Sequence, residues 1–229
     1  MLTFSRVFWC LAVALSPVVA LAGDTVRIVC LGDSVTKAAR EGVSPDQSFC
    51  VLLERALSKP QRPIEVVNAG IGGNTTADGL ARLERDVLVH RPRYVVLMFG
   101  LNDSWVDEGR TASRVSVSTY RENLARMITE IRDRGATVVL MTPNPAIAPK
   151  YSADRNVTLK PYVDAVRELA RSEKLELVDV YGRFAEFAVE GTELNSLFTD
   201  AMHPNPAGQK LIAEMLISRL QPILGREEK

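Results

Sequence analysis

The sequence has few of the residues that bind transition metals. Its 229 residues include two histidines and three cysteines, and no C-x-x-C motif occurs. The spacing of these residues therefore indicates no metal site. Cys30 and Cys50 could pair in an oxidising compartment, but both stand in apolar segments, where a cysteine more often packs as a free thiol.

The sequence also lacks an excess of positive charge and a long apolar run. Lys and Arg number 28, as do Asp and Glu, so the formal net charge is +0. This balance of charge is not typical of a protein that binds nucleic acid. No stretch reaches the roughly 20 apolar residues of a membrane-spanning helix, so we expect no stable membrane insertion. With 46% hydrophobic and 24% charged residues, the composition is that of a globular protein.

The first 22 residues have the pattern of a secretory signal peptide. One basic side chain, Arg6, precedes an apolar run over residues 7–19, and the small residues Ala20 and Ala22 follow. An uncleaved membrane anchor is the alternative, but the run is short and contains Pro17. We therefore predict cleavage after Ala22 and a secreted or periplasmic protein.

The rest of the chain, residues 23–229, alternates short apolar runs with amphipathic segments and reads as a single domain. The predicted strands are residues 26–31, 64–68, 94–99, 137–141 and 175–180. The predicted helices are residues 46–58, 76–90, 117–134, 159–174 and 206–224. Such alternation predicts an α/β fold, a three-layer α/β/α sandwich around a five-stranded parallel sheet.

Four segments could carry chemistry: three follow successive strands at the predicted carboxyl edge of the sheet, and the fourth precedes the last helix. Ser34 follows the first strand, either as an exposed hydroxyl or as an ordinary helix cap. A glycine-rich loop follows the second strand, over residues 68–76. Asn102 follows the third strand, as an oxyanion donor or a turn residue. Asp200 stands three residues before His203, close enough to reach its ring, although a lone surface histidine is the plainer interpretation.

Taken together, the four segments resemble the conserved blocks of the SGNH hydrolases, also called the GDSL esterase/lipase family. The matching blocks are GDSV at 32–35, NAGIGGN at 68–74, GLND at 100–103 and DAMH at 200–203. They occur in the family's order and span nearly all of the predicted mature chain. The resemblance implies the flavodoxin-like SGNH fold and a serine ester hydrolase that needs no cofactor or metal.

The resemblance also implies a role for each matched residue. Ser34 corresponds to the nucleophile, His203 to the base and Asp200 to the carboxylate that orients it. The oxyanion donors correspond to the Ser34 N–H, the Gly73 N–H and the Asn102 side chain. We expect pairing with the carboxylate to raise the pKa of His203.

The substrate is less defined by the sequence. Trp105 lies three residues after Asn102 and could bind a sugar or an acyl chain, or could anchor its own loop. No apolar lid helix appears, which favours a short acyl group, such as acetyl, on a polar or carbohydrate carrier. A thioesterase or lysophospholipase of the same family is the alternative, followed by a non-catalytic glycan-binding module. The partner is therefore a small-molecule or glycan ester, and the oligomeric state stays open.

Overall fold

A five-stranded, fully parallel sheet forms the centre of the computed structural model, which describes residues 25–147, 153–189 and 193–226. The predicted signal peptide lies outside these residues. The strands lie in the order β2-β1-β3-β4-β5. Their bounds are β1 (Val26–Gly32), β2 (Ile64–Gly70), β3 (Tyr94–Met98), β4 (Thr137–Met141) and β5 (Glu176–Val178). The structure confirms the predicted fold class.

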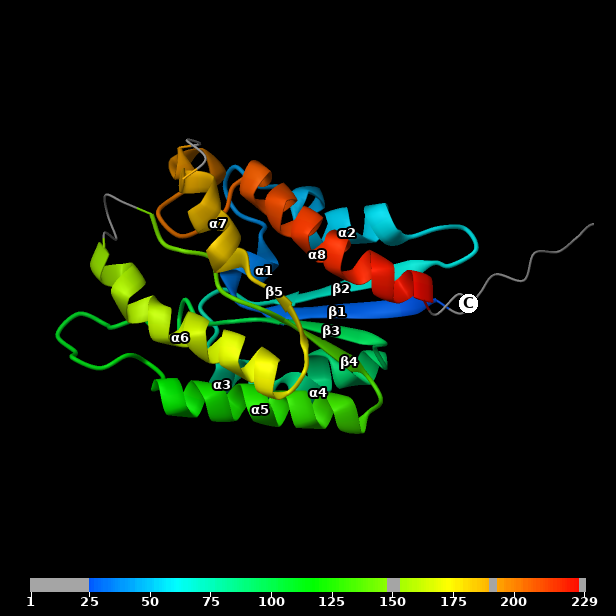
Figure 1. Ribbon diagram of the computed structural model, residues 1–229, viewed down its shortest axis with the longest axis horizontal. Helices are drawn as coiled ribbons and strands as arrows, with labels where there is room; N and C mark the ends of the chain where they lie inside the picture. Colours follow the sequence, from blue (N-terminus) through cyan, green and yellow to red (C-terminus); the bar gives the residue numbers. More distant parts are fainter. Residues whose placement is uncertain (1–24, 148–152, 190–192, 227–229) are drawn as a thin grey trace, which may run out of the picture.

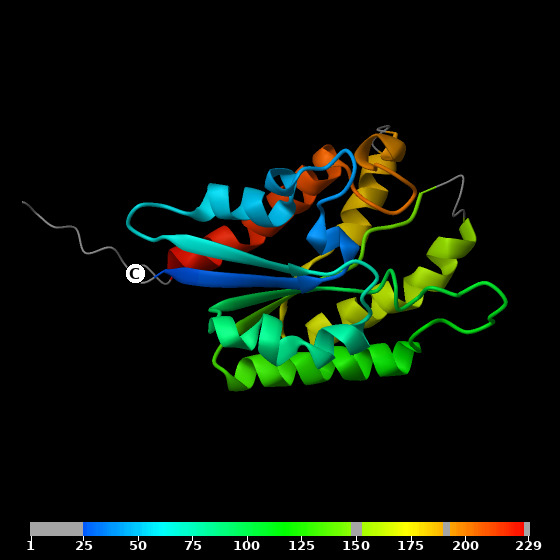
Figure 2. The ribbon, with the colours of Figure 1, turned by 180° about the vertical axis from the view of Figure 1, so that it is seen from behind.

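Helices cover both faces of this sheet (Figures 1 and 2). On one side lie α2 (Phe49–Leu57), α7 (Val180–Val189) and α8 (Pro206–Arg226). On the other lie α3 (Thr76–Ala81), α4 (Leu83–Asp86), α5 (Val117–Asp133) and α6 (Ala153–Ser172). The four-residue helix α1 (Ser34–Lys37) follows β1 directly.

The alternation of side chains along a strand produces two separate cores. In β1, Ile28 and Cys30 belong to the cluster that packs against α2 and α8. Val29 and Leu31 belong to the cluster that packs against α5 and α6. Because β1 is buried on both faces, its sequence is a continuous apolar run rather than an alternating one.

Several predicted elements differ from those observed. The helix predicted over residues 76–90 is interrupted at Arg82 and continues as α4 and a single turn at Leu88–His90. The fifth strand is shorter than predicted, and the prediction missed α7, whose aromatic and β-branched residues are poor helix formers. Helix α6 begins at Ala153, six residues earlier than predicted, and contains Pro161.

Two further findings concern the cysteines and the membrane. Cys30 and Cys50 are free thiols, and both are buried in the same core cluster. Across the part of the chain that the structure describes, no helix combines the length and the apolar character of a membrane span.

Candidate active site

Ser34 lies at the carboxyl end of β1, on a tight turn from strand to helix. Asp33 caps α1, since its carboxylate accepts a 2.8 Å hydrogen bond from the Val35 N–H. A glycine is needed at position 32, because a Cβ there would lie 2.1 Å from Thr36 Oγ1. As the first residue of α1, Ser34 has an amide among those that lack an acceptor within the helix. Both its hydroxyl and its amide are therefore placed at the sheet edge.

A continuous chain of hydrogen bonds joins Ser34, His203 and Asp200. Ser34 Oγ lies 2.9 Å from His203 Nε2, and His203 Nδ1 lies 2.7 Å from Asp200 Oδ2. Asp200 Oδ1 also accepts from the backbone N–H groups of Met202 and His203, at 2.8 and 2.9 Å. The carboxylate thus holds the imidazole with Nε2 facing the hydroxyl, the arrangement that can remove a proton from a serine.

The net effect of the surroundings is to lower the pKa of His203, contrary to the expectation from the sequence. Burial lowers this pKa most, the hydrogen bond to Asp200 raises it, and the positive charge of Arg40 lowers it further. Burial also raises the pKa of Asp200, but its hydrogen bonds outweigh that effect and hold the pKa below its usual value. His203 is therefore neutral, and able to accept a proton, over a wider range of acidic pH than an exposed histidine.

The loop carrying Asp200 and His203 is held by the connection between β4 and α6. Asn144 Nδ2 donates a 2.9 Å hydrogen bond to the Met202 carbonyl. A backbone hydrogen bond adds a second contact, from the Ile147 N–H to the Ala201 carbonyl at 2.8 Å. Residues in the middle of the chain thus fix the position of the loop that carries Asp200 and His203 near its end.

The two remaining oxyanion candidates, Gly73 and Asn102, lie on loops that are hydrogen-bonded to each other. Gly73 has a φ of +81°, a left-handed conformation that favours glycine. A Cβ on the preceding Gly72 would lie 3.8 Å from the Ser34 Cβ, so this loop passes directly beside Ser34. Asn102 Nδ2 donates a 3.0 Å hydrogen bond to the Asn74 carbonyl. Because an amide nitrogen carries two hydrogens, the second can be offered to a ligand.

Trp105 packs against two arginines. The guanidinium carbons of Arg155 and Arg114 lie 5.0 and 5.9 Å from the centre of its ring. Arg155 is itself buried and donates to the Ser104 carbonyl at 3.1 Å. These contacts support the interpretation that Trp105 anchors its own loop, while its partial exposure leaves room for contact with a substrate.

Two arginines at the site stand in no recognisable sequence motif. Arg40 donates a 2.9 Å hydrogen bond to the Ser34 carbonyl and lies 3.9 Å from Asp200. Arg82 donates a 2.9 Å hydrogen bond to the carbonyl of Gly32. No sequence signal would have found either residue, because most arginines point into solvent and these turn inward.

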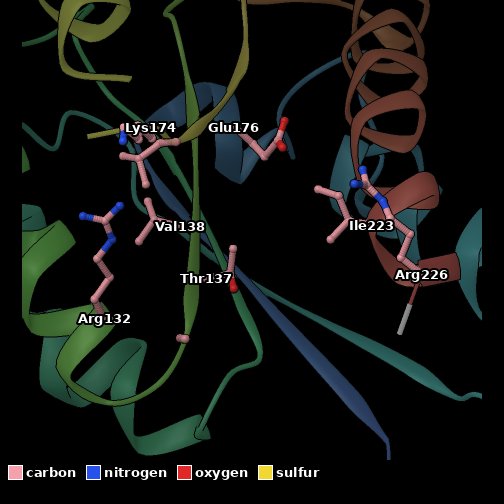
Figure 3. A pocket seen from close by; sticks show the side chains of 9 residues that line it. Arg132, Thr137, Val138, Lys174, Glu176, Ile223 and Arg226 are labelled. Atoms are coloured by element: carbon pink, nitrogen blue, oxygen red, sulfur yellow. The ribbon is translucent and has the colours of Figure 1, made fainter. Parts of the chain in front are cut away.

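A separate pocket of about 530 Å³ lies at the opposite edge of the sheet, at the amino ends of β4 and β5 (Figure 3). Arg132, Lys174, Glu176 and Arg226 give it a charged rim, and Ile223 contributes to its apolar wall. Its described lining includes no serine, cysteine or histidine. The hydrogen-bonded group of Ser34, His203 and Asp200 lies at the other end of the strands.

The chain is similar to a known protein family, to curated proteins and to solved structures. The model of the GDSL-like lipase/acylhydrolase family matches residues 30–211. An acetylxylan esterase of Geobacillus stearothermophilus is 28% identical over 211 residues, which cover 86% of this chain and 95% of that protein. The thioesterase 1/protease 1/lysophospholipase L1 of Escherichia coli (strain K12) is 26% identical over 221 residues, covering 91% and 88%.

Solved structures are similar over most of the chain. The lipase/acylhydrolase from Enterococcus faecalis has a TM-score of 0.73 at 27% identity, covering 86% of this chain and 96% of that one. Two structures of the Geobacillus acetylxylan esterase are of catalytic mutants, in which a serine or a histidine is replaced by alanine.

Proposed function

This chain belongs to the GDSL-like lipase/acylhydrolase family and is a carboxylic ester hydrolase, and we propose that it works through an acyl-enzyme on Ser34. The hydrogen-bonded chain from Ser34 through His203 to Asp200 is the observation that carries this proposal. The catalytic serine and histidine mutants of the related acetylxylan esterase support it.

The reaction follows from the geometry. Ser34 Oγ attacks the ester carbonyl while its proton passes to His203 Nε2, and Asp200 stabilises the imidazolium that forms. Negative charge develops on the carbonyl oxygen, where the Ser34 and Gly73 N–H groups and the Asn102 amide donate. As the carbon–oxygen bond breaks, His203 returns the proton to the departing alcohol. Water then attacks the acyl-enzyme with His203 as the base, which releases the acid and restores Ser34.

For the substrate, we propose a short acyl group, such as acetyl, on a polar or carbohydrate carrier. The acetylxylan esterase among the relatives supports this choice. The thioesterase/lysophospholipase of Escherichia coli favours a second candidate, a longer acyl chain on a thioester or a lysophospholipid. A non-catalytic glycan-binding module is disfavoured, because binding alone gives no reason for Ser34 to face a base.

We also propose that the enzyme acts after export. Residues 1–22 have the charge, apolar run and small residues of a signal peptide. The first strand begins at Val26, a few residues after the predicted cleavage point, so removal of the leader leaves the sheet intact.

A screen of substrates tests the proposed function. The mature protein is assayed with p-nitrophenyl acetate, butyrate and octanoate, with acetylated xylo-oligosaccharides and with acyl-CoA, and Ser34→Ala serves as the control. We expect the acetyl esters to give the highest kcat/KM and Ser34→Ala to lose nearly all activity while keeping its Tm. A preference for octanoate or acyl-CoA would favour the second candidate. Equal activity in Ser34→Ala would contradict the proposed nucleophile.

A further inference from the structure

Arg82 lies at the break between α3 and α4, and its buried side chain reaches the carboxyl edge of the sheet. Its guanidinium donates to four acceptors. These are the Gly32 carbonyl at 2.9 Å, the Ala69 carbonyl at 2.7 Å, Asn74 Oδ1 at 2.8 Å and Asp86 Oδ2 at 3.1 Å. One side chain therefore connects the ends of β1 and β2 with the glycine-rich loop.

The Arg82 guanidinium is linked to all three proposed oxyanion donors. It contacts the segments of two of them directly, and it reaches the third through one further hydrogen bond. Gly32 is two residues before Ser34, whose N–H is the first donor. Asn74 follows Gly73, whose N–H is the second. The Asn74 carbonyl accepts the hydrogen bond that holds the Asn102 amide, the third donor. Arg82 is thus the common support of three donors that come from three different loops.

The ion pair with Asp86 does not account for the placement of Arg82. Asp86 is already held by Arg85, which contacts it at 2.6 and 3.0 Å from a solvent-exposed position. The other three acceptors of Arg82 are neutral oxygens, and all lie beside the site. A planar guanidinium with five N–H donors can donate to all four of these acceptors at once, whereas the ammonium of lysine cannot.

We propose that Arg82 is a positioning residue that holds the three oxyanion donors in register, and that it thereby sets kcat rather than KM. This inference rests on the proposed function, because it concerns the same oxyanion hole. Oxyanion contacts tighten in the transition state, so a small displacement of the donors weakens transition-state binding more than substrate binding.

The first test compares Arg82→Lys with Arg85→Gln, a matched control that removes the exposed partner of Asp86. Both are assayed with p-nitrophenyl acetate well below their Tm. We expect Arg82→Lys to lower kcat by about 100-fold, as misplacement of about 1 Å does, with KM changed less than about threefold. Arg85→Gln should stay within about twofold of wild type in kcat. A wild-type kcat in a folded Arg82→Lys protein would overturn the proposal.

A second test separates positioning from general loss of stability. In the Asn102→Ala background, Arg82→Lys should cost less than it does in wild type, because one of the three donors it positions is already gone. Fully additive losses would overturn the proposal. Asn74→Ala removes a single acceptor of Arg82 and should lower kcat by a smaller factor, which Asn74→Asp should restore. These two variants provide the test if Arg82→Lys fails to fold.

The two proposals fail differently. If wild type shows no hydrolysis that depends on Ser34, the proposed function is wrong whatever Arg82 does. If wild type is active through Ser34 while Arg82→Lys keeps its kcat, only the positioning role is wrong.

Discussion

The protonation of His203 is controlled by neighbours that act in opposite directions. Burial and the charge of Arg40 lower the pKa of His203, whereas Asp200 raises it, and the net direction is downward. His203 must be neutral to accept the proton of Ser34, so activity is lost as pH falls through this pKa. The acidic limb of kcat/KM should therefore lie below the ordinary histidine value of 6.5.

Substitutions of the two charged neighbours of His203, Asp200 and Arg40, should move the acidic limb of the pH profile in opposite directions. Asp200→Asn removes the group that raises the pKa, so the limb should shift to lower pH, while kcat falls because the imidazolium loses its counter-charge. Arg40→Met removes a group that lowers the pKa, so the limb should shift to higher pH. The measurement is the pH profile of kcat/KM for both variants beside wild type. Shifts of the same sign would contradict the assignment.

The role of Asn102 can be tested by removing its amide. Asn102→Ala deletes one donor aimed at the developing oxyanion, which typically costs about 100- to 1,000-fold in turnover. The loss should appear in kcat, because the contact strengthens in the transition state. Steady-state kinetics with p-nitrophenyl acetate provide the measurement. A rise in KM with kcat unchanged would make Asn102 a substrate-binding residue instead.

At the scale of elements, the packing of α3 on the sheet depends on a residue without a side chain. Gly79 faces the buried ring of Phe99, the residue that directly follows β3 in the chain. A Cβ on Gly79 would lie 2.5 Å from the ring, too close for the helix to keep its place. The close approach of this helix brings Thr76, at its start, within 2.8 Å of the buried Asp103 carboxylate.

Gly79→Ala should therefore destabilise the protein, although alanine is the better helix former. We expect a loss of about 1–3 kcal/mol in the free energy of unfolding, the usual cost of overpacking a core. Gly225→Ala in α8 is the control, since a Cβ there meets nothing within 4 Å. Urea unfolding of both variants measures the difference. A stabilised Gly79→Ala protein would show that α3 shifts at little cost.

At the scale of the whole molecule, two cores on opposite faces of the sheet hold the site in place. Ser34 follows β1, whereas His203 lies 169 residues further along the chain, in the loop that precedes α8. Helices α2 and α8 pack together on the same face. Gln209 of α8 donates to the Val35 carbonyl at 3.1 Å and thereby ties this helix to α1.

Within the residues that the structure describes, this packing includes no disulfide. Cys30 and Cys50 are free and buried, and burial raises the pKa of Cys50, which lowers its reactivity. We expect a thiol reagent to label neither cysteine in the native protein. After denaturation it should label both, plus Cys10 if the leader has not been removed. Reductant should leave the Tm unchanged, and a Tm that falls with reductant would reveal a disulfide.

The sequence by itself determined the class of fold and indicated which groups are candidates for the reaction. Ser34, Asn102, Asp200 and His203 stand in short motifs, and the alternation of apolar runs with amphipathic segments is a local property of the chain. The motifs and the alternation can both be recognised without any knowledge of tertiary contacts. The sequence also correctly predicted that Asp200 could reach His203, because three residues separate them.

Only the tertiary structure decided what surrounds those groups. The pKa of His203 falls rather than rises because its burial comes from segments far away in the chain, and desolvation has no signature in a motif. The same holds for Arg82, whose acceptors lie as much as 50 residues away. A helical pattern predicts which residues share a face, but it does not reveal that one arginine at a break in its helix connects the ends of two strands with the glycine-rich loop.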